Sequence, residues 1–147
     1  MKRILSDIPQ AAEVLFCDST GSVDRFGTKT FILFTNSCCG GLPVCIMLTS
    51  CESQDAFVLC LELFKSFLDD RSFGGRGILG PNVIMTDDDK VEKNGFAQSF
   101  PHSTQLLCIF HILQACWRNL CNSDSNVPSE NRQEIFFQFK IFICSHL

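Results

Sequence analysis

The sequence has no tyrosine, only 19% charged residues and no apolar run near the roughly 20 residues that span a membrane. We therefore expect no contact with a membrane. No apolar stretch follows the basic start at Lys2 and Arg3, so we expect no signal peptide and place the protein in the nucleus or the cytoplasm.

Basic clusters are also absent. The net charge is −4, and lysine and arginine are scattered along the 147 residues. A protein that binds nucleic acid by itself usually carries a basic stripe. If this chain meets DNA, we expect other regions of a longer protein to supply most of the positive charge that neutralises phosphate.

Phenylalanine and cysteine are abundant, with 15 and 10 residues, and 46% of the chain is hydrophobic. This composition is typical of one globular domain. Most cysteines lie inside apolar runs, where a free thiol behaves as a small buried hydrophobe. We therefore expect thiols, as in reducing compartments, and no disulfide scaffold.

Periodicity in the first half predicts three strands followed by a helix. The strands are expected over 13–17, 28–36 and 42–49, joined by short turns as in an antiparallel meander. Ser53 is a suitable N-cap for a helix that extends to about residue 68.

The second half alternates strands and helices after a glycine-rich loop over 71–81. Strands are expected over 83–85 and 105–110, and helices over 90–100, from about 109 to 121 and over 131–144. The fold class is therefore α/β, with a mixed sheet of three antiparallel strands and two parallel-type strands and with flanking helices, which is the order of an RNase H-like fold. We expect an N-terminal extension over 1–12, the core over 13–121, and a linker with a C-terminal helix over 122–147.

Two acidic residues follow buried strands. Asp18 closes the first predicted strand and Asp87 the fourth. These strands are neighbours in an RNase H-like sheet, so the two carboxylates would converge at one edge and could hold Mg²⁺ or Mn²⁺, which prefer oxygen ligands. Alternatively, an aspartate at a strand end is a turn former or a helix cap, and we expect Asp88 and Asp89 to favour the start of the next helix.

Three blocks of the sequence resemble the Mutator-like (MULE) transposase domain, in the order of that family. They are Asp18-Ser19-Thr20 with Arg25-Phe26-Gly27, Met85-Thr86-Asp87-Asp88-Asp89, and Phe100-Pro101 followed by the run from Leu107 to Leu113. Together they cover about residues 13–120. Phe110 stands where the family often has tryptophan.

The resemblance implies an RNase H-like DDE domain that cleaves DNA and transfers strands with divalent metal ions. It implies that Asp18 and Asp87 are catalytic and bind Mg²⁺ or Mn²⁺. It also assigns the family's C-x-x-H pair to Cys108 and His111. This pair could supply two ligands to Zn²⁺, but tetrahedral zinc needs four, so the alternative is a packed thiol and a hydrogen-bonded histidine.

The family's third acid lies further downstream than Leu147, so we expect the chain to be truncated before it and inactive alone. This leaves open whether the chain is an enzyme. The alternative function is a domesticated, non-catalytic module that contacts DNA or protein. The sequence also leaves open whether the chain forms a homo-oligomer.

Overall fold

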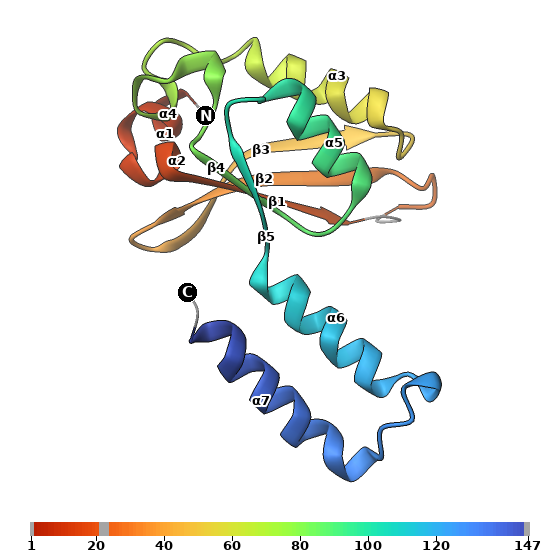
Figure 1. The fold of residues 1–147 in the computed structure, drawn as a ribbon. Coiled ribbons are helices and arrows are strands. Elements are labelled where there is room, and N and C mark those ends of the chain that lie inside the picture. Colours follow the sequence, from red (N-terminus) through yellow and green to blue (C-terminus); the bar gives the residue numbers. More distant parts are fainter. Residues whose placement is uncertain (1, 21–23, 146–147) are drawn as a thin grey trace. The chain divides into compact units, whose positions relative to one another are not determined.

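The computed structural model describes residues 2–20 and 24–145, which form two compact units over residues 1–107 and 108–147 (Figure 1). Within the described residues, no helix combines the length and the apolar character needed to cross a bilayer.

The first unit is built on a five-stranded mixed sheet with the strand order β3-β2-β1-β4-β5. Strands β1 (Val14–Thr20), β2 (Lys29–Ser37) and β3 (Gly40–Thr49) form an antiparallel meander. Strand β4 (Val83–Thr86) pairs in parallel with β1, and β5 (Thr104–Leu107) pairs in parallel with β4. The predicted fold class is confirmed.

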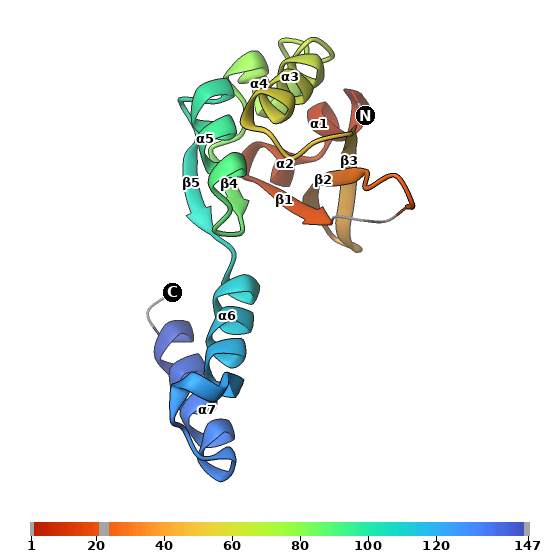
Figure 2. The same ribbon diagram turned by 90° about the vertical axis from the view of Figure 1, so that its right-hand side faces the viewer.

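Two helices, α3 (Gln54–Lys65) and α5 (Lys90–Ser99), cover one face of this sheet (Figures 1 and 2). The Ser53 hydroxyl accepts a hydrogen bond of 3.2 Å from the backbone N–H of Ala56, which confirms the predicted N-cap of α3. Phe57 of α3 lies with its ring centroid 4.6 Å from that of Phe31 on β2 and 5.3 Å from that of Phe96 on α5. These three rings join both helices to the sheet.

Short helical segments border the sheet. Two lie at the start of the chain, α1 (Lys2–Asp7) and α2 (Pro9–Glu13), and two precede β4, α4 (Ser72–Gly75) and the 3₁₀ turn η1 (Gly77–Leu79). Leu5 and Ala11 are fully buried in the core of this unit. The segment expected as an extension therefore contributes to the core, and the expected loop over 71–81 contains helical turns; the domain boundaries themselves stay a prediction.

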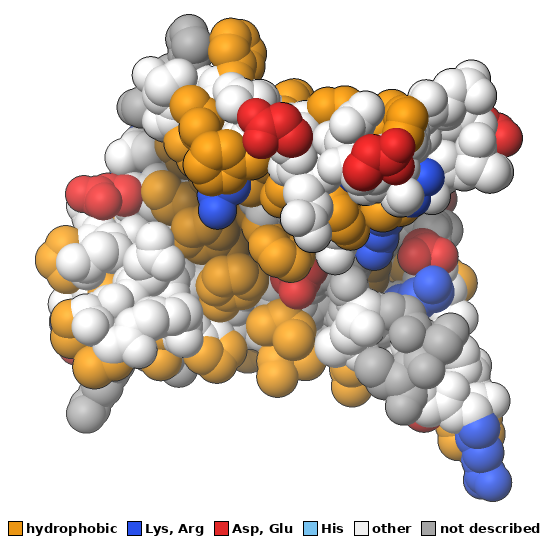
Figure 3. All heavy atoms as spheres, turned by 90° about the horizontal axis from the view of Figure 1, so that it is seen from below, with side chains coloured by type: hydrophobic (Ala, Val, Ile, Leu, Met, Phe, Trp, Pro, Cys, Tyr) orange, Lys and Arg blue, Asp and Glu red, His pale blue; other side chains and the backbone are white. Residues whose placement is uncertain are grey.

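The opposite face of the sheet carries a stacked aromatic pair, Phe16 and Phe34, with ring centroids 5.0 Å apart. Ile32 and Ile46 pair with each other and lie on this face too. Side chains alternate along a strand, and each isoleucine is next in sequence to a residue that faces α3. Ile46 remains 61% exposed. Figure 3, a view of the molecule from below, shows hydrophobic side chains at the surface.

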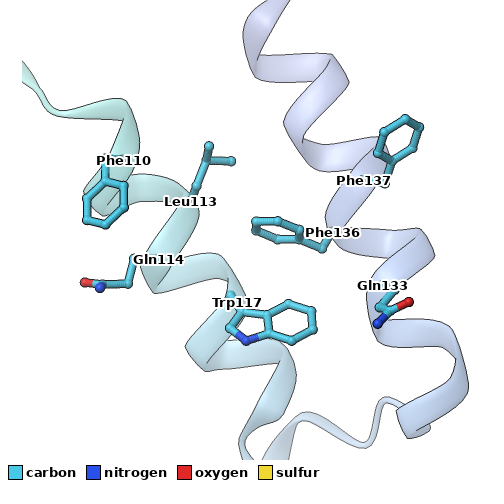
Figure 4. A pocket seen from close by; sticks show the side chains of 7 residues that line it. All are labelled: Phe110, Leu113, Gln114, Trp117, Gln133, Phe136 and Phe137. Atoms are coloured by element: carbon cyan, nitrogen blue, oxygen red, sulfur yellow. The ribbon is translucent and has the colours of Figure 1, made fainter.

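The second unit is a pair of helices, α6 (Ile109–Cys121) and α7 (Arg132–Cys144), joined by the turns η2 (Ser123–Ser125) and η3 (Ser129–Asn131). The expected strand over 105–110 is shorter than predicted, because β5 ends at Leu107 and helix α6 begins at Ile109. Trp117 packs edge-on against Phe136 at 5.3 Å, beside an apolar groove between the helices (Figure 4).

Candidate metal centre

Asp18 lies inside β1, two residues before its end, so the predicted position at the end of the strand is wrong by two residues. It pairs with Ile32 of β2. Side chains alternate along a strand, so Asp18 lies on the same face as Phe16. That face is opposite to the one covered by α3 and α5.

Asp87 immediately follows Thr86, the last residue of β4, as predicted. The parallel register pairs Phe16 with Met85, and each aspartate lies two residues beyond its member of that pair. Asp18 and Asp87 therefore hold corresponding positions if this register is continued two residues beyond its last pair. Both predicted site residues thus follow the last paired residues of two neighbouring parallel strands.

The three consecutive aspartates after β4 have different roles. Asp87 Oδ1 accepts a hydrogen bond of 2.9 Å from the backbone N–H of Asp89. Asp89 caps α5, because its Oδ1 accepts from the N–H groups of Val91 at 2.7 Å and Glu92 at 3.1 Å. Asp88 is bound to Lys93 at 2.9 Å, a contact that lowers the pKa of its carboxyl. The expected association of Asp88 and Asp89 with the helix start is confirmed.

Glu92, a buried carboxylate near Asp87 and Asp89, was not predicted from the sequence. Its side chain is 1% exposed, and neither oxygen has a donor in good hydrogen-bond geometry among the described residues. Burial, followed by the negative charge of Asp87, raises its pKa to about 7, while the nearby Ser19 hydroxyl and Cys17 thiol partly oppose this rise. Spacing was the available signal, since Glu92 shares a helix face with Phe96 and Ser99, which are both buried.

The pKa of the Cys17 thiol reflects the negative charge of this region. It lies on the helix-covered face of β1 and is 3% exposed. Its pKa is raised well above the ordinary value, first by burial and then by Glu92, Asp87 and Asp18. One buried side chain is therefore within electrostatic reach of all three carboxylates.

The chemistry of this edge suits a hard cation, because its donors are carboxylate oxygens at corresponding positions of two chain segments. Within the described residues, however, no three or more His, Cys, Asp or Glu side chains are gathered closely enough to hold a metal ion. The fit therefore rests on Asp18 and Asp87 as a pair.

Cys108 and His111 lie in the second unit. Cys108 is the half-buried residue before α6, and half-buried His111 is in the first turn of that helix, with its ring edge-on to Phe110 at 5.5 Å. Within this unit, Cys116 and Cys121 are the candidates to complete a zinc site, and among its described residues they form no ligand cluster with the pair. Zinc binding by Cys108 and His111 stays an untested prediction.

The five-stranded mixed sheet, with three antiparallel strands, two parallel strands and flanking helices, is consistent with an RNase H-like α/β domain. The family model of the MULE transposase domain matches residues 14–115, so the chain belongs to this family. No curated protein matches the chain.

Proposed function

We propose that this MULE transposase domain holds Mg²⁺ or Mn²⁺ between Asp18 and Asp87, in a site whose ancestral chemistry is DNA cleavage and strand transfer. The observation that supports this most directly is the parallel pairing of β1 with β4, in which each aspartate lies two residues beyond the last pair, Phe16 and Met85. Carboxylates far apart along the chain thereby offer oxygen ligands at one place.

Backbone structure orients both carboxylates before any ligand arrives. The backbone of Asp18 is held by pairing with β2, and the Asp87 carboxylate accepts a hydrogen bond from the N–H of Asp89. Little reorganisation is then needed to bind a cation. A divalent ion in such a site would polarise a phosphodiester and increase the acidity of an attacking water or hydroxyl.

We expect no DNA cleavage by this chain alone, since two aspartates leave a metal site without the third carboxylate that normally completes it. The net charge of −4 also implies that most affinity for DNA comes from other regions. Localisation to the nucleus or the cytoplasm and assembly into a homo-oligomer belong to this proposal as well.

The second candidate function is a non-catalytic module, derived from a transposase, that contacts protein or DNA. The exposed apolar side chains of the sheet and of α7 favour it, among them Ile46, Leu48, Phe137 and Phe142. Such a module has no need of a metal ion.

Manganese binding separates the two functions. The free Mn²⁺ signal in electron paramagnetic resonance measures binding to the full chain, to Asp18→Asn and to Asp87→Asn. Each substitution should weaken binding about tenfold or more. Asp70→Asn, at an exposed carboxylate in a turn, is the matched control and should bind as the unsubstituted chain does. No binding by the unsubstituted chain, or full binding by both variants, would refute the metal site.

A further inference from the structure

We propose that Cys38 and Cys39 form a dithiol site that a low-molecular-weight disulfide oxidises reversibly. The site lies in the hairpin turn between β2 and β3, and it is separate from the proposed metal site. The pairing of Asp18 with Ile32 places that aspartate away from the turn, because β2 reaches the turn only at Ser37.

The two thiols converge at the surface of the protein. Their sulfur atoms are 3.7 Å apart, and both side chains are free and exposed. The pairing of Ser37 with Gly40 closes the turn around them. The Ser37 hydroxyl also accepts a hydrogen bond of 3.2 Å from the N–H of Cys39 and donates one of 2.8 Å to the carbonyl of Gly40. The hairpin therefore holds two exposed nucleophilic groups side by side.

Oxidation of this pair is a two-step thiol–disulfide exchange. One thiolate attacks a sulfur of the small disulfide, which breaks its S–S bond, forms a mixed disulfide and releases one small thiol. The neighbouring thiolate then attacks the protein sulfur of the mixed disulfide and releases the second small thiol. The protein loses two protons and two electrons, and the oxidant gains both in becoming two thiols. The second step requires another thiol within reach, which the separation of 3.7 Å provides.

Adjacency in the chain favours a disulfide that is easily reduced. Consecutive Cα atoms are about 3.8 Å apart across a trans peptide, whereas disulfides usually join Cα atoms roughly 4.4–6.8 Å apart. A bond between Cys38 and Cys39 is therefore strained, and strained or exposed disulfides are the labile ones. The site is thus suited to a reversible modification and not to a structural crosslink.

Three other cysteines differ from this pair. Burial raises the pKa of the Cys45 and Cys60 thiols, which leaves less of the thiolate that attacks disulfides. Cys51 is exposed, and hydrogen bonding to Ser53 lowers the pKa of its thiol. The group near its sulfur is the Ser53 hydroxyl, at 3.5 Å. A small thiol should therefore remain attached to Cys51, because a hydroxyl does not displace it from the mixed disulfide.

The test places the reduced full chain in buffers of glutathione and glutathione disulfide, stops exchange with acid, and locates disulfides and adducts by peptide mass spectrometry. In the unsubstituted chain we expect a disulfide between Cys38 and Cys39 that dithiothreitol reverses. Cys38→Ser and Cys39→Ser should instead retain glutathione on the remaining cysteine, at least about tenfold more than that position does in the unsubstituted chain, because a tethered thiol acts at a high effective concentration. Cys51→Ser is the matched control and should form the same disulfide.

Three results would overturn the proposal. They are retention of glutathione at Cys38 or Cys39 of the unsubstituted chain as high as in the single variants, thiols that stay free at every buffer ratio, and a disulfide from either residue to another cysteine. Circular dichroism of the reduced variants checks that each is folded. Mn²⁺ binding should be the same in Cys38→Ser as in the unsubstituted chain, so the dithiol and the metal site are tested independently.

Discussion

At the scale of single residues, the carboxyl group of Glu92 couples the stability of the fold to pH. Its pKa is about 7 in the folded state, against an ordinary value of 4.5. The folded protein therefore holds the proton more tightly than the unfolded chain. The destabilisation is absent below about pH 4.5, grows as pH rises between 4.5 and 7, and is complete above 7.

Measurement of urea unfolding at pH 5 and pH 8, with a chelator present, tests this coupling. The contribution of Glu92 should lower the free energy of unfolding by up to about 3 kcal/mol across this interval. Glu92→Gln should lose most of that pH dependence and be the more stable protein at pH 8. Glu52→Gln should keep it, and equal slopes for Glu92→Gln and the unsubstituted chain would contradict the raised pKa.

The two aspartates illustrate how far single residues can be interpreted from sequence. Asp87 was correctly predicted to follow the fourth strand, because the apolar run before it is short and clearly bounded. Asp18 was predicted to end its strand, but β1 continues through Ser19 and Thr20, which pair with β2. Pairing with β2 extends β1 beyond its apolar residues. The local sequence of β1 does not reveal that pairing.

At the scale of elements, helix α5 depends on its cap. The Asp89 carboxylate satisfies two N–H groups of the first turn. Asp89→Ala should lower the free energy of unfolding by about 1 kcal/mol, whereas Asp89→Asn should lose little, because asparagine is also a good N-cap. Chemical denaturation measures both. Asp88→Asn, which removes only an exposed ion pair, serves as the control, and an equal loss there would refute the capping role.

Close packing of α5 on α3 provides a second test at this scale. A Cβ atom added at Gly95 would lie 2.5 Å from Cδ1 and 3.0 Å from Cε1 of the buried Phe57 ring. Gly95→Ala should therefore destabilise the fold by about 1–3 kcal/mol, although alanine is the better helix former. At Gly41 the nearest atom would be 3.4 Å away, so Gly41→Ala should have little effect. Thermal unfolding of both variants makes the comparison, and a neutral Gly95→Ala would show that Phe57 moves freely.

At the scale of the whole molecule, the two compact units differ in the amount of apolar surface they bury. The described residues of the first unit contain 15 buried hydrophobic side chains, whereas those of the second contain Leu120. Helix α7 has no buried residue. Since burial of apolar surface is the main source of stability, we expect the second unit to unfold more readily.

Trp117, the single tryptophan, reports on the second unit through its contact with Phe136. Its fluorescence should change at a lower urea concentration than the one that releases the protected amides of β1 and β2 in hydrogen exchange. Phe136→Ala should lower the fluorescence midpoint further and leave the exchange of β2 unchanged. Coincident transitions would show that both units unfold together.

Local patterns in the chain were sufficient for the order of the five strands and of the longer helices α3, α5, α6 and α7, but not for the short helices α1, α2 and α4. Alternation of apolar residues and N-capping side chains act over a few residues, so they can be recognised without a structure. The environment of Glu92 could not be recognised in this way, because its burial depends on β1, which lies more than 70 positions earlier in the chain. The burial of Leu5 and Ala11 likewise follows from packing between distant segments, and such contacts form only when the chain has folded.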